Sequence, residues 1–215
     1  YVTNRQHYKN FRKFIQYNPN KASDPNRLDE RYYLWHRTTF DALLNYDKAF
    51  GSHNLKGLLG WHTEKYNYTE NQMTRRNFPN NDLTDMNAGD AATQTNSGYT
   101  RELAMISWFG RVNYDYAGKY YISANYRRDG SSRLGINKRW GNFWSLSGAW
   151  RVSSESFMKP LQNWLSDLKL RVSYGVNGTL PSSYYGYMGL SSLTSNYNDN
   201  PGITQSQLEN KELTW

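Results

Sequence analysis

The feature that most constrains this chain is a strict alternation of apolar and polar side chains between residues 107 and 127. Trp108, Val112 and Tyr116 belong to one row, and polar residues such as Arg111 and Asn113 fall between its members. A period of two sends successive side chains to opposite faces of a β-strand. The alternation pauses at a short glycine-containing link, residues 117–119, and then resumes. The pattern therefore predicts an antiparallel hairpin.

Similar alternation marks other strands. One ends at Phe50, one runs over about 54–68, one over 142–152 and one over 167–176. The register of the second is ambiguous because Leu58 and Leu59 are adjacent, and we prefer the row that contains Leu59. Residues 1–30 are interpreted as loop-like, and residues 31–215 as strands joined by long loops.

The connections between these strands differ in length. The links at 51–53 and 117–119 are short, the link at 154–166 is moderate and contains a short helical piece, and 69–102 and 177–211 are long polar segments. Residues 129–141 form another expected loop, and the final "ELTW" is expected to begin a further strand. Loops longer than about 12–15 residues are unusual in compact soluble domains. Short turns that alternate with long loops are typical of outer-membrane barrels.

Composition agrees with a chain that is apolar on one face only. The sequence has 19 Tyr, 8 Trp and 8 Phe, yet its mean hydropathy is −0.93. It contains no run of about 18 apolar residues that would make a membrane helix, and no signal peptide is recognisable at its start. We therefore expect an all-β fold, an antiparallel portion of a transmembrane β-barrel with short periplasmic turns and long extracellular loops. A soluble carbohydrate-binding β-sandwich is the alternative, because it is also two-faced.

Signals for enzymatic chemistry are weak. The chain has no cysteine, which excludes disulfides, zinc-thiolate sites and cysteine nucleophiles. Its four histidines lack metal-binding spacing, and no nucleophile-elbow motif occurs. We expect no enzyme activity, no metal and no cofactor. The net charge of +8 is scattered and no nucleic-acid module accompanies it, so a nucleic-acid partner is not expected.

Several segments in one order carry a resemblance to a known family. They are "RTTFDALLNYDKAFGSHNLKGLLGW", "SWFGRVNYDYAGKYYISANYRRDGSSRLGINKRWGNFWSLSGAWRVSSESFM", "WLSDLKLRVSYGVNGT" and the terminal "NKELTW". Together they closely resemble the barrel of SusC/RagA-type TonB-dependent outer-membrane transporters. The resemblance covers about residues 38–215.

The resemblance implies a plugged barrel of about 22 strands in the outer membrane of a Gram-negative bacterium. It further implies energised import of glycans, oligosaccharides or peptides, with a TonB complex and a SusD-like surface lipoprotein as partners. On this interpretation, residues 1–215 are part of one β-barrel domain. The family's plug and closing C-terminal strands have no counterpart in this stretch.

The alternation assigns side chains to two environments. We expect outer-membrane lipids as a partner, in contact with the side chains of Trp108, Val112, Trp144 and Trp150. We expect a hydrogen-bonded lining of the lumen from Arg111, Asn113, Asp115, Arg151 and Arg171.

Two groups are candidates for contact with substrate or with the lid protein. The charged group is Arg127, Arg128, Asp129 and Arg133, for which ion pairing within the loops or contact with anionic lipopolysaccharide is the alternative. The aromatic group is Tyr184, Tyr185 and Tyr187, whose rings could stack on sugars or pack on neighbouring loop residues.

Overall fold

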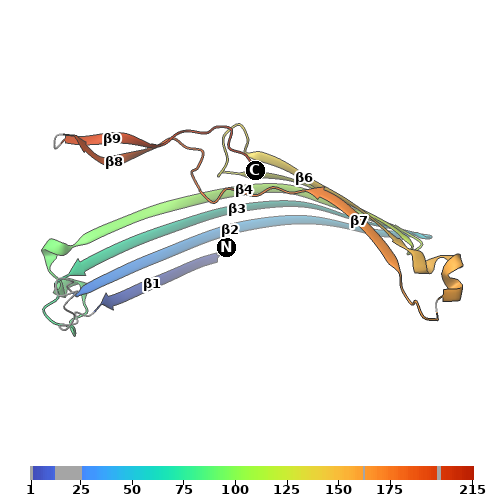
Figure 1. Ribbon diagram of the computed structural model, residues 1–215, viewed down its shortest axis with the longest axis horizontal. Helices are drawn as coiled ribbons and strands as arrows, with labels where there is room; N and C mark the ends of the chain where they lie inside the picture. Colours follow the sequence, from blue (N-terminus) through green and yellow to red (C-terminus); the bar gives the residue numbers. More distant parts are fainter. Residues whose placement is uncertain (1, 13–25, 162, 198–199) are drawn as a thin grey trace. The chain divides into compact units, whose positions relative to one another are not determined.

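The computed structural model describes residues 2–12, 26–161, 163–197 and 200–215, and it is built almost entirely of strands (Figure 1). Seven strands form one antiparallel sheet in sequence order, β1-β2-β3-β4-β5-β6-β7. A second sheet consists of β8 and β9 alone. The expected all-β, antiparallel fold is confirmed.

The strands differ markedly in length. Their bounds are β1 Val2–Arg12, β2 Arg27–Phe50, β3 His53–Arg76, β4 Thr95–Tyr116, β5 Tyr120–Ser131, β6 Trp140–Arg151, β7 Lys169–Val176, β8 Leu190–Tyr197 and β9 Asn200–Gln207. Four short 3₁₀ helices occur in connections: η1 Met86–Ala88, η2 Ala91–Thr93, η3 Val152–Ser154 and η4 Ser156–Leu161.

Two tight turns set the register of the longest hairpins. Gly51, with φ +60°, lies in the turn between β2 and β3. Ala117 and Gly118, with φ of 53° and 64°, lie between β4 and β5. Positive φ matches the twist of a hairpin turn and is readily adopted by glycine. Asp115 Oδ1 accepts a hydrogen bond from the Gly118 amide at 3.2 Å and stabilises the second turn.

The chain divides into two compact units, which are described separately. Unit 1 comprises residues 1–38 and 65–102, and unit 2 comprises residues 39–64 and 103–215. In unit 1, β1 pairs along β2 from Val2 opposite Arg37 to Arg12 opposite Arg27.

The connection between β3 and β4, residues 77–94, is anchored in unit 1 by Asn26. Its side-chain amide donates to the Phe78 carbonyl at 3.1 Å, and its side-chain oxygen accepts from the Phe78 amide at 2.6 Å. Asn26 and Phe78 are both buried. This pair of bonds fixes one end of the connection to the start of β2.

In unit 2, the register carries one row across four strands. Val112 on β4 lies opposite Ala124 on β5, Ala124 lies opposite Leu146 on β6, and Leu146 lies opposite Tyr174 on β7. Residues directly opposite each other in an antiparallel pair have side chains on the same face. The hairpin predicted for residues 107–127 is therefore present, and its pattern continues over β6 and β7.

Strands extend further than the sequence analysis expected. Residues 1–30 were interpreted as loop-like, but β1 occupies 2–12 and β2 begins at Arg27. Likewise β3 continues to Arg76, and β4 already begins at Thr95. The expected loop 129–141 shrinks to 132–139 because β5 and β6 extend into it. These added portions are mostly polar and their few apolar residues are not regularly spaced, so they carry no apolar alternation to reveal them.

The C-terminal part also differs from expectation. Strands β8 and β9 lie within the expected loop 177–211. The final "ELTW" is not a strand. Its Leu213 carbonyl accepts from the Gly135 amide at 2.9 Å, and the Trp215 indole donates to the Arg139 carbonyl at 3.3 Å. These residues therefore pack onto the β5–β6 loop.

A conventional hydrophobic core is not what holds the sheet together. Among the described residues, the buried hydrophobic side chains are Leu28, Phe78, Leu103, Leu134, Val152 and Met158. They are scattered over strands, loops and η3–η4. Large exposed hydrophobic side chains are far more numerous. The sheet leaves its main apolar surface uncovered within the described chain.

Candidate functional site

The main feature of unit 2 is an apolar row on one face of β4–β7. Its members are Trp108, Val112, Tyr114, Tyr116, Tyr120, Ile122, Ala124, Tyr126, Trp144, Leu146, Trp150, Leu170, Val172, Tyr174 and Val176. On β3, Trp61 stacks with Trp108 at a centroid distance of 5.7 Å, so the row continues there. The register preferred for β3, with Leu59 and Trp61 on one face, agrees with this contact.

The row is open rather than covered. Tyr114 is half-buried, and exposure of the other large side chains ranges from 37% at Trp150 to 74% at Val172, with Trp108 at 55% and Val112 at 50%. A soluble β-sandwich would bury these side chains against a second sheet. The exposure therefore disfavours that alternative.

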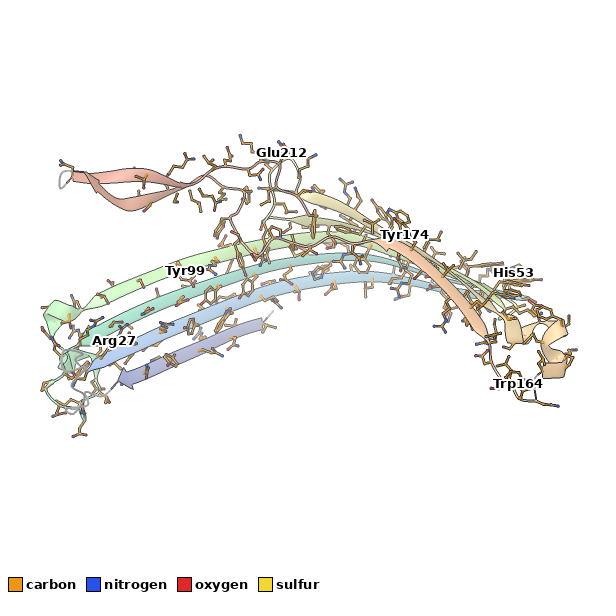
Figure 2. All side chains as sticks on the ribbon, viewed as in Figure 1. Arg27, His53, Tyr99, Trp164, Tyr174 and Glu212 are labelled. Carbon is orange, nitrogen blue, oxygen red and sulfur yellow. The ribbon has the colours of Figure 1, made fainter. Side chains whose placement is uncertain are left out.

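Aromatic rings gather at both ends of the row, and Figure 2 shows the side chains along these strands. Near the short turn, Tyr116 and Tyr120 stack at 6.4 Å. Eight residues earlier on β4, Trp108 marks the other end. Between them on the same face of β4 lie Gly110, Val112 and Tyr114, with Val112 at the centre. Bands of aromatic residues that flank an apolar zone are the signature of a membrane-crossing barrel wall.

A single carboxylate ties the turn-side rings together. Glu155 accepts hydrogen bonds from the Tyr120 hydroxyl at 2.7 Å and from the Trp150 indole at 3.2 Å. Its other oxygen accepts from the Lys119 ammonium at 3.0 Å. These three hydrogen bonds lower the pKa of Glu155 to about 2, and the bond from Tyr120 has the largest effect. The cluster of Glu155, Lys119, Tyr120 and Trp150, here called the turn clasp, joins the β4–β5 turn to the β6–β7 connection.

The opposite face of unit 2 is a hydrogen-bonded polar surface. Asn113 Oδ1 accepts from the Ser123 hydroxyl at 2.6 Å, and the Asn125 amide donates to the Ser145 hydroxyl at 3.0 Å. Arg111 donates from Nε to Asn125 Oδ1. Neighbouring strands are therefore cross-linked through side chains on this face.

The same face carries the other side chains expected to line a lumen. Asp115 accepts from the Asn54 amide at 3.1 Å, and Arg151 pairs with Asp167 at 3.5 Å. Arg171 and Asp115 line one hollow of about 500 Å³. All five residues expected on the polar face, including Arg111 and Asn113, therefore lie on the face opposite the apolar row.

One aromatic contact interrupts the polar face. The Phe109 ring lies directly on Gly60, so closely that a Cβ added to Gly60 would overlap the ring. The guanidinium of Arg127, on β5, lies 5.6 Å from the centroid of the same ring. Gly60 therefore provides the space that Phe109 occupies.

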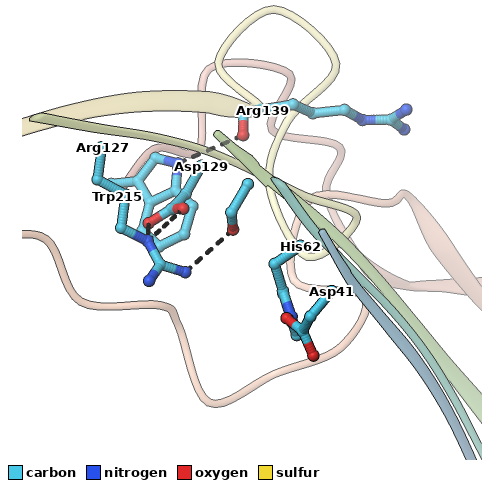
Figure 3. A network of polar contacts seen from close by, with 7 residues as sticks. Asp41, His62, Arg127, Asp129, Arg139 and Trp215 are labelled. Atoms are coloured by element: carbon cyan, nitrogen blue, oxygen red, sulfur yellow. Dashed lines mark hydrogen bonds and ion pairs between the residues drawn. The ribbon is translucent and has the colours of Figure 1, made fainter. Parts of the chain in front are cut away.

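The expected charged group, Arg127, Arg128, Asp129 and Arg133, is not one cluster. Arg127 Nε donates to both Asp129 oxygens at 2.6 and 2.7 Å, and its terminal nitrogen donates to the Ser107 hydroxyl at 3.0 Å (Figure 3). Arg128 is opposite Trp108, in the row of the other face, and lies 5.1 Å from the Trp140 ring centroid. The reason is that β5 continues to Ser131, so consecutive residues alternate between faces.

Figure 3 also shows a second polar pair on this face, His62 with Asp41. The two side chains meet at 2.7 Å between Nδ1 and Oδ1. The sequence analysis gave His62 no role. The alternation along β2 and β3 could have revealed this pair, because Asp41 and His62 each fall on the face opposite their apolar neighbours Phe40 and Trp61.

Arg133 and the expected tyrosines meet in a loop cluster. The Arg133 guanidinium lies 4.0 Å from the Tyr184 ring centroid and donates to the Pro181 carbonyl at 3.3 Å. Arg139 lies 5.8 Å from the Tyr187 ring centroid. Tyr185 lies next to Tyr184, with ring centroids 6.4 Å apart. All three tyrosines are half-buried, so each contributes to packing between the 132–139 and 177–189 loops.

Unit 1 contains an aromatic group that the sequence analysis missed. Tyr33 and Trp35 on β2 stack at 5.5 Å, Trp35 lies 5.5 Å from Tyr68 on β3, and Tyr68 lies 5.9 Å from Tyr99 on β4. Spacings of two residues between Tyr33 and Trp35 and between Tyr66 and Tyr68 were the available signal. Both pairs lay in expected strands, whereas Tyr99 lay in the expected loop 69–102.

Two searches of the described residues bear on chemistry. They contain no group of three or more His, Cys, Asp or Glu side chains placed to hold a metal ion. Their helices are all too short and too polar to cross a membrane, a finding that concerns helices alone.

Comparison with known sequences yields relatives of one kind. The chain is 32% identical over 214 residues, 97% of its length, to the TonB-dependent receptor P39 of Formosa agariphila. It is 29% identical over 165 residues, 72% of its length, to the TonB-dependent receptor SusC of Bacteroides thetaiotaomicron. The aligned regions cover 20% and 16% of those proteins, so the chain spans about a fifth of the relatives it matches. No protein-family model matches the chain.

Solved structures agree. The RagAB peptide importer in its closed-closed state matches 99% of the chain with a TM-score of 0.85 and 25% identity, and the chain covers 24% of that protein. The open-open state of the same importer matches 99% of the chain with a TM-score of 0.82 and 26% identity, over 23% of that protein. The two-faced sheet and the matches over nearly the whole of this chain have one explanation. The chain belongs to the SusC/RagA-type TonB-dependent transporters and corresponds to part of their β-barrel.

Proposed function

We propose that this stretch forms part of the wall of a nutrient importer in the outer membrane of a Gram-negative bacterium, energised through a TonB complex. The observation that carries the proposal is the apolar row of β4–β7, which is continuous across strands, exposed, and bounded by aromatic rings. Trp108 to Tyr116 is eight residues, or about 27 Å along a strand. At a tilt of about 40° this gives a height of about 21 Å, close to the apolar band of about 25 Å in known barrels.

In this arrangement the row faces lipid and the opposite face lines a wet lumen. Trp108, Val112, Trp144 and Trp150 then contact acyl chains or headgroups. The lumen lining comprises Arg111, Asn113, Asp115, Arg151 and Arg171. The turns at 51–52 and 117–119 lie on the periplasmic side, and the connections at 77–94 and 177–189 lie outside the cell. The polar lining suits contact with a plug, because its groups can exchange hydrogen bonds with another polar surface.

The partner we propose at the outer mouth is a SusD-like surface lipoprotein, and the cargo is a glycan, an oligosaccharide or a peptide. Relatives named SusC and structures titled as a peptide importer support this class of transport. Asp129 with Arg127, and Arg133 with the tyrosines Tyr184, Tyr185 and Tyr187, remain our candidates for shaping that mouth. Arg128, on the face of the apolar row, suits an anionic lipid headgroup better than a cargo.

The test is energised uptake by the full-length protein. A strain that lacks the gene is complemented with the full-length wild type, and uptake of fluorescently labelled oligosaccharides and peptides is measured with and without a protonophore. We expect uptake of at least one cargo that needs the gene and collapses when the proton gradient is dissipated. Uptake that persists without a gradient would contradict the proposed mechanism.

The partner is tested separately. We expect the full-length transporter, extracted from outer membranes in mild detergent, to form a stoichiometric complex with a co-expressed SusD-like lipoprotein. Loss of uptake in a strain that lacks this lipoprotein would support a shared function. Full uptake in its absence would contradict the proposed SusD-like partner but not the proposed import function.

A further inference from the structure

The β6–β7 connection, residues 152–168, exposes large apolar side chains although it lies outside the strands. Phe157, Leu161 and Trp164, here called the connection patch, are 61%, 41% and 77% exposed. Trp164 is thus more exposed than any tryptophan of the apolar row. Three such side chains within eight residues indicate an interaction surface rather than scattered exposure. The proposed lipid contact of the strands does not account for them, because they belong to a connection.

The connection is folded and fixed at both ends. Val152 and Met158 are buried, so part of its apolar content packs inside unit 2. The Ser153 amide donates to the Leu168 carbonyl at 3.2 Å, and the Ser153 hydroxyl donates to Asp167 Oδ1 at 2.9 Å. These bonds join the beginning of the connection to its end. The outward position of the connection patch is therefore set by the fold.

The connection patch is continuous with the apolar row at the end of β6. The Phe157 ring meets the Trp150 ring edge-on, with centroids 6.5 Å apart. Trp150 lies opposite Leu170 of β7, which is 55% exposed and belongs to the same row. In the turn clasp, Tyr120 and Trp150 both donate to Glu155, two residues before Phe157. The apolar surface that begins on the strands therefore extends onto the connection.

The connection patch lies at the end of unit 2 that carries the short turns. The Arg151 amide donates to the carbonyl of Lys119, in the β4–β5 turn, at 2.7 Å. Figure 2 labels Trp164 toward the same end as His53, which begins β3. In the proposed arrangement this end is periplasmic, so the adjoining lipids are those of the inner leaflet. The exposed Lys159 of η4 has a stem long enough to bring its ammonium group to lipid phosphates.

We propose that the β6–β7 connection is a membrane-interface anchor, in which the connection patch inserts among the phospholipids of the inner leaflet of the outer membrane. Lys159 then lies at the level of their phosphates. A phospholipid surface suits the patch because it already adjoins the apolar row, and because tryptophan and lysine side chains favour the headgroup level. The inference rests on the proposed barrel wall and adds a lipid contact outside the strands.

The experiment reports the surroundings of single positions in the full-length transporter, reconstituted in bilayers of phosphatidylethanolamine and phosphatidylglycerol. Leu161→Cys and Trp164→Cys, in a cysteine-free background, are labelled with the fluorophore NBD. Quenching by a nitroxide near the head of the lipid chain is compared with quenching by aqueous iodide. Ser166→Cys, at an exposed polar position of the same connection, is the control.

The anchor predicts opposite preferences at the patch and at the control. We expect the lipid nitroxide to quench the labels at 161 and 164 at least about twofold more than the label at 166, and iodide to show the reverse order. Equal quenching of the three labels by each quencher would overturn the anchor.

A second measurement distinguishes lipid from a protein partner. The same cysteines are labelled by a water-soluble maleimide in isolated outer membranes and in the reconstituted bilayers. Slow labelling at 161 and 164 in both membranes supports the anchor. Fast labelling in the reconstituted bilayers with protection only in outer membranes would mean that another protein covers the patch, and the anchor would be overturned.

Val112→Cys separates the anchor from the proposed barrel wall. Its label is compared with a nitroxide near the end of the lipid chain, because Val112 lies at the centre of the apolar row. If lipid quenches the label at 112 but not those at 161 and 164, the anchor falls and the wall stands. If iodide rather than lipid quenches the label at 112, the wall itself falls, and the anchor with it.

Discussion

One strand shows both kinds of environment found in this chain. In the part of β4 that belongs to unit 2, the even-numbered side chains include Ile106, Trp108 and Val112, all exposed and apolar. In the part that belongs to unit 1, the even-numbered residues are Asn96, Gly98, Thr100 and Glu102. The backbone geometry is a strand throughout. What changes along the strand is the polarity of the row.

The change is less complete on β2. Phe40 and Leu44 are exposed apolar residues in unit 2, whereas in unit 1 the same row mixes Glu30 and His36 with Tyr32 and Leu34. A tilted strand crosses a bilayer in about 9–11 residues. Strands β2 and β3 have 24 residues and β4 has 22, so each is about twice as long as a crossing needs. The exposed apolar row is therefore a feature of unit 2, and the same strands are more polar in unit 1.

The largest expected effect comes from a charge in the apolar row. Val112→Arg should destabilise the full-length barrel by about 2–4 kcal/mol, because it places a guanidinium near the bilayer midplane. Urea unfolding in lipid vesicles, followed by tryptophan fluorescence, measures the change. Ser123→Arg, on the polar face, should cost clearly less, and equal tolerance of the two variants would contradict the assignment of faces.

Thr100→Arg applies the same test to unit 1. Thr100 is exposed and belongs to the same row of β4 as Val112, and its hydroxyl meets that of Thr69 at 3.2 Å. We expect a loss of about 1 kcal/mol or less, the value of one exposed hydrogen bond. A loss as large as that of Val112→Arg would mean that the apolar environment extends along the whole strand.

An intermediate effect is expected at Gly60. In Gly60→Ala the new methyl would overlap the Phe109 ring, so unfolding free energy should fall by about 1–3 kcal/mol, as in overpacked sites. Gly98→Ala is the counterpart in unit 1, where the nearest atom is the flexible Asn71 side-chain oxygen at 2.5 Å. Urea midpoints should shift less for Gly98→Ala, and the reverse order would place the tighter packing in unit 1.

The smallest effect concerns the turn clasp and its dependence on pH. The pKa of Glu155 is about 2 in the folded protein and about 4.5 in the unfolded chain. The charged carboxylate therefore contributes its full stabilisation above pH 4.5, and this contribution is lost as the pH falls through 2. Glu155→Ala should therefore lower the urea midpoint slightly at pH 7, and this difference from wild type should persist at pH 5 and shrink toward pH 2. A difference that grows on acidification would contradict the sign of the linkage.

The sequence predicted best where one face of a strand is apolar and the other is polar. The residues from Trp108 to Tyr126 alternate in this way, and the turn at Ala117–Lys119 has the required glycine. Register on β6 and β7 followed from the same rule. In such strands a slip by one residue would reverse the two faces.

Prediction failed where both faces meet water. Strand β1 has Asn4 and Gln6 on one side and Arg5 and Lys9 on the other, so no period of apolar residues reveals it. The same reasoning applies to β8 and β9. The aromatic group of unit 1, Tyr33, Trp35, Tyr68 and Tyr99, was missed for a different reason. Its members lie on three strands, and the closeness of Tyr99 to the others depends on strand pairing across a long connection that a single sequence does not reveal.

The most direct test of the two environments is an accessibility scan along β4. Single cysteines replace each residue from 96 to 116 in the full-length transporter, are spin-labelled, and are compared in lipid for collision with oxygen and with a water-soluble nickel chelate. The account predicts oxygen-dominated collisions at even positions from 108 to 116 and chelate-dominated collisions at every position from 96 to 102. Chelate access at 108, 112 and 116, or a period of two that continues unchanged through 96, would contradict it.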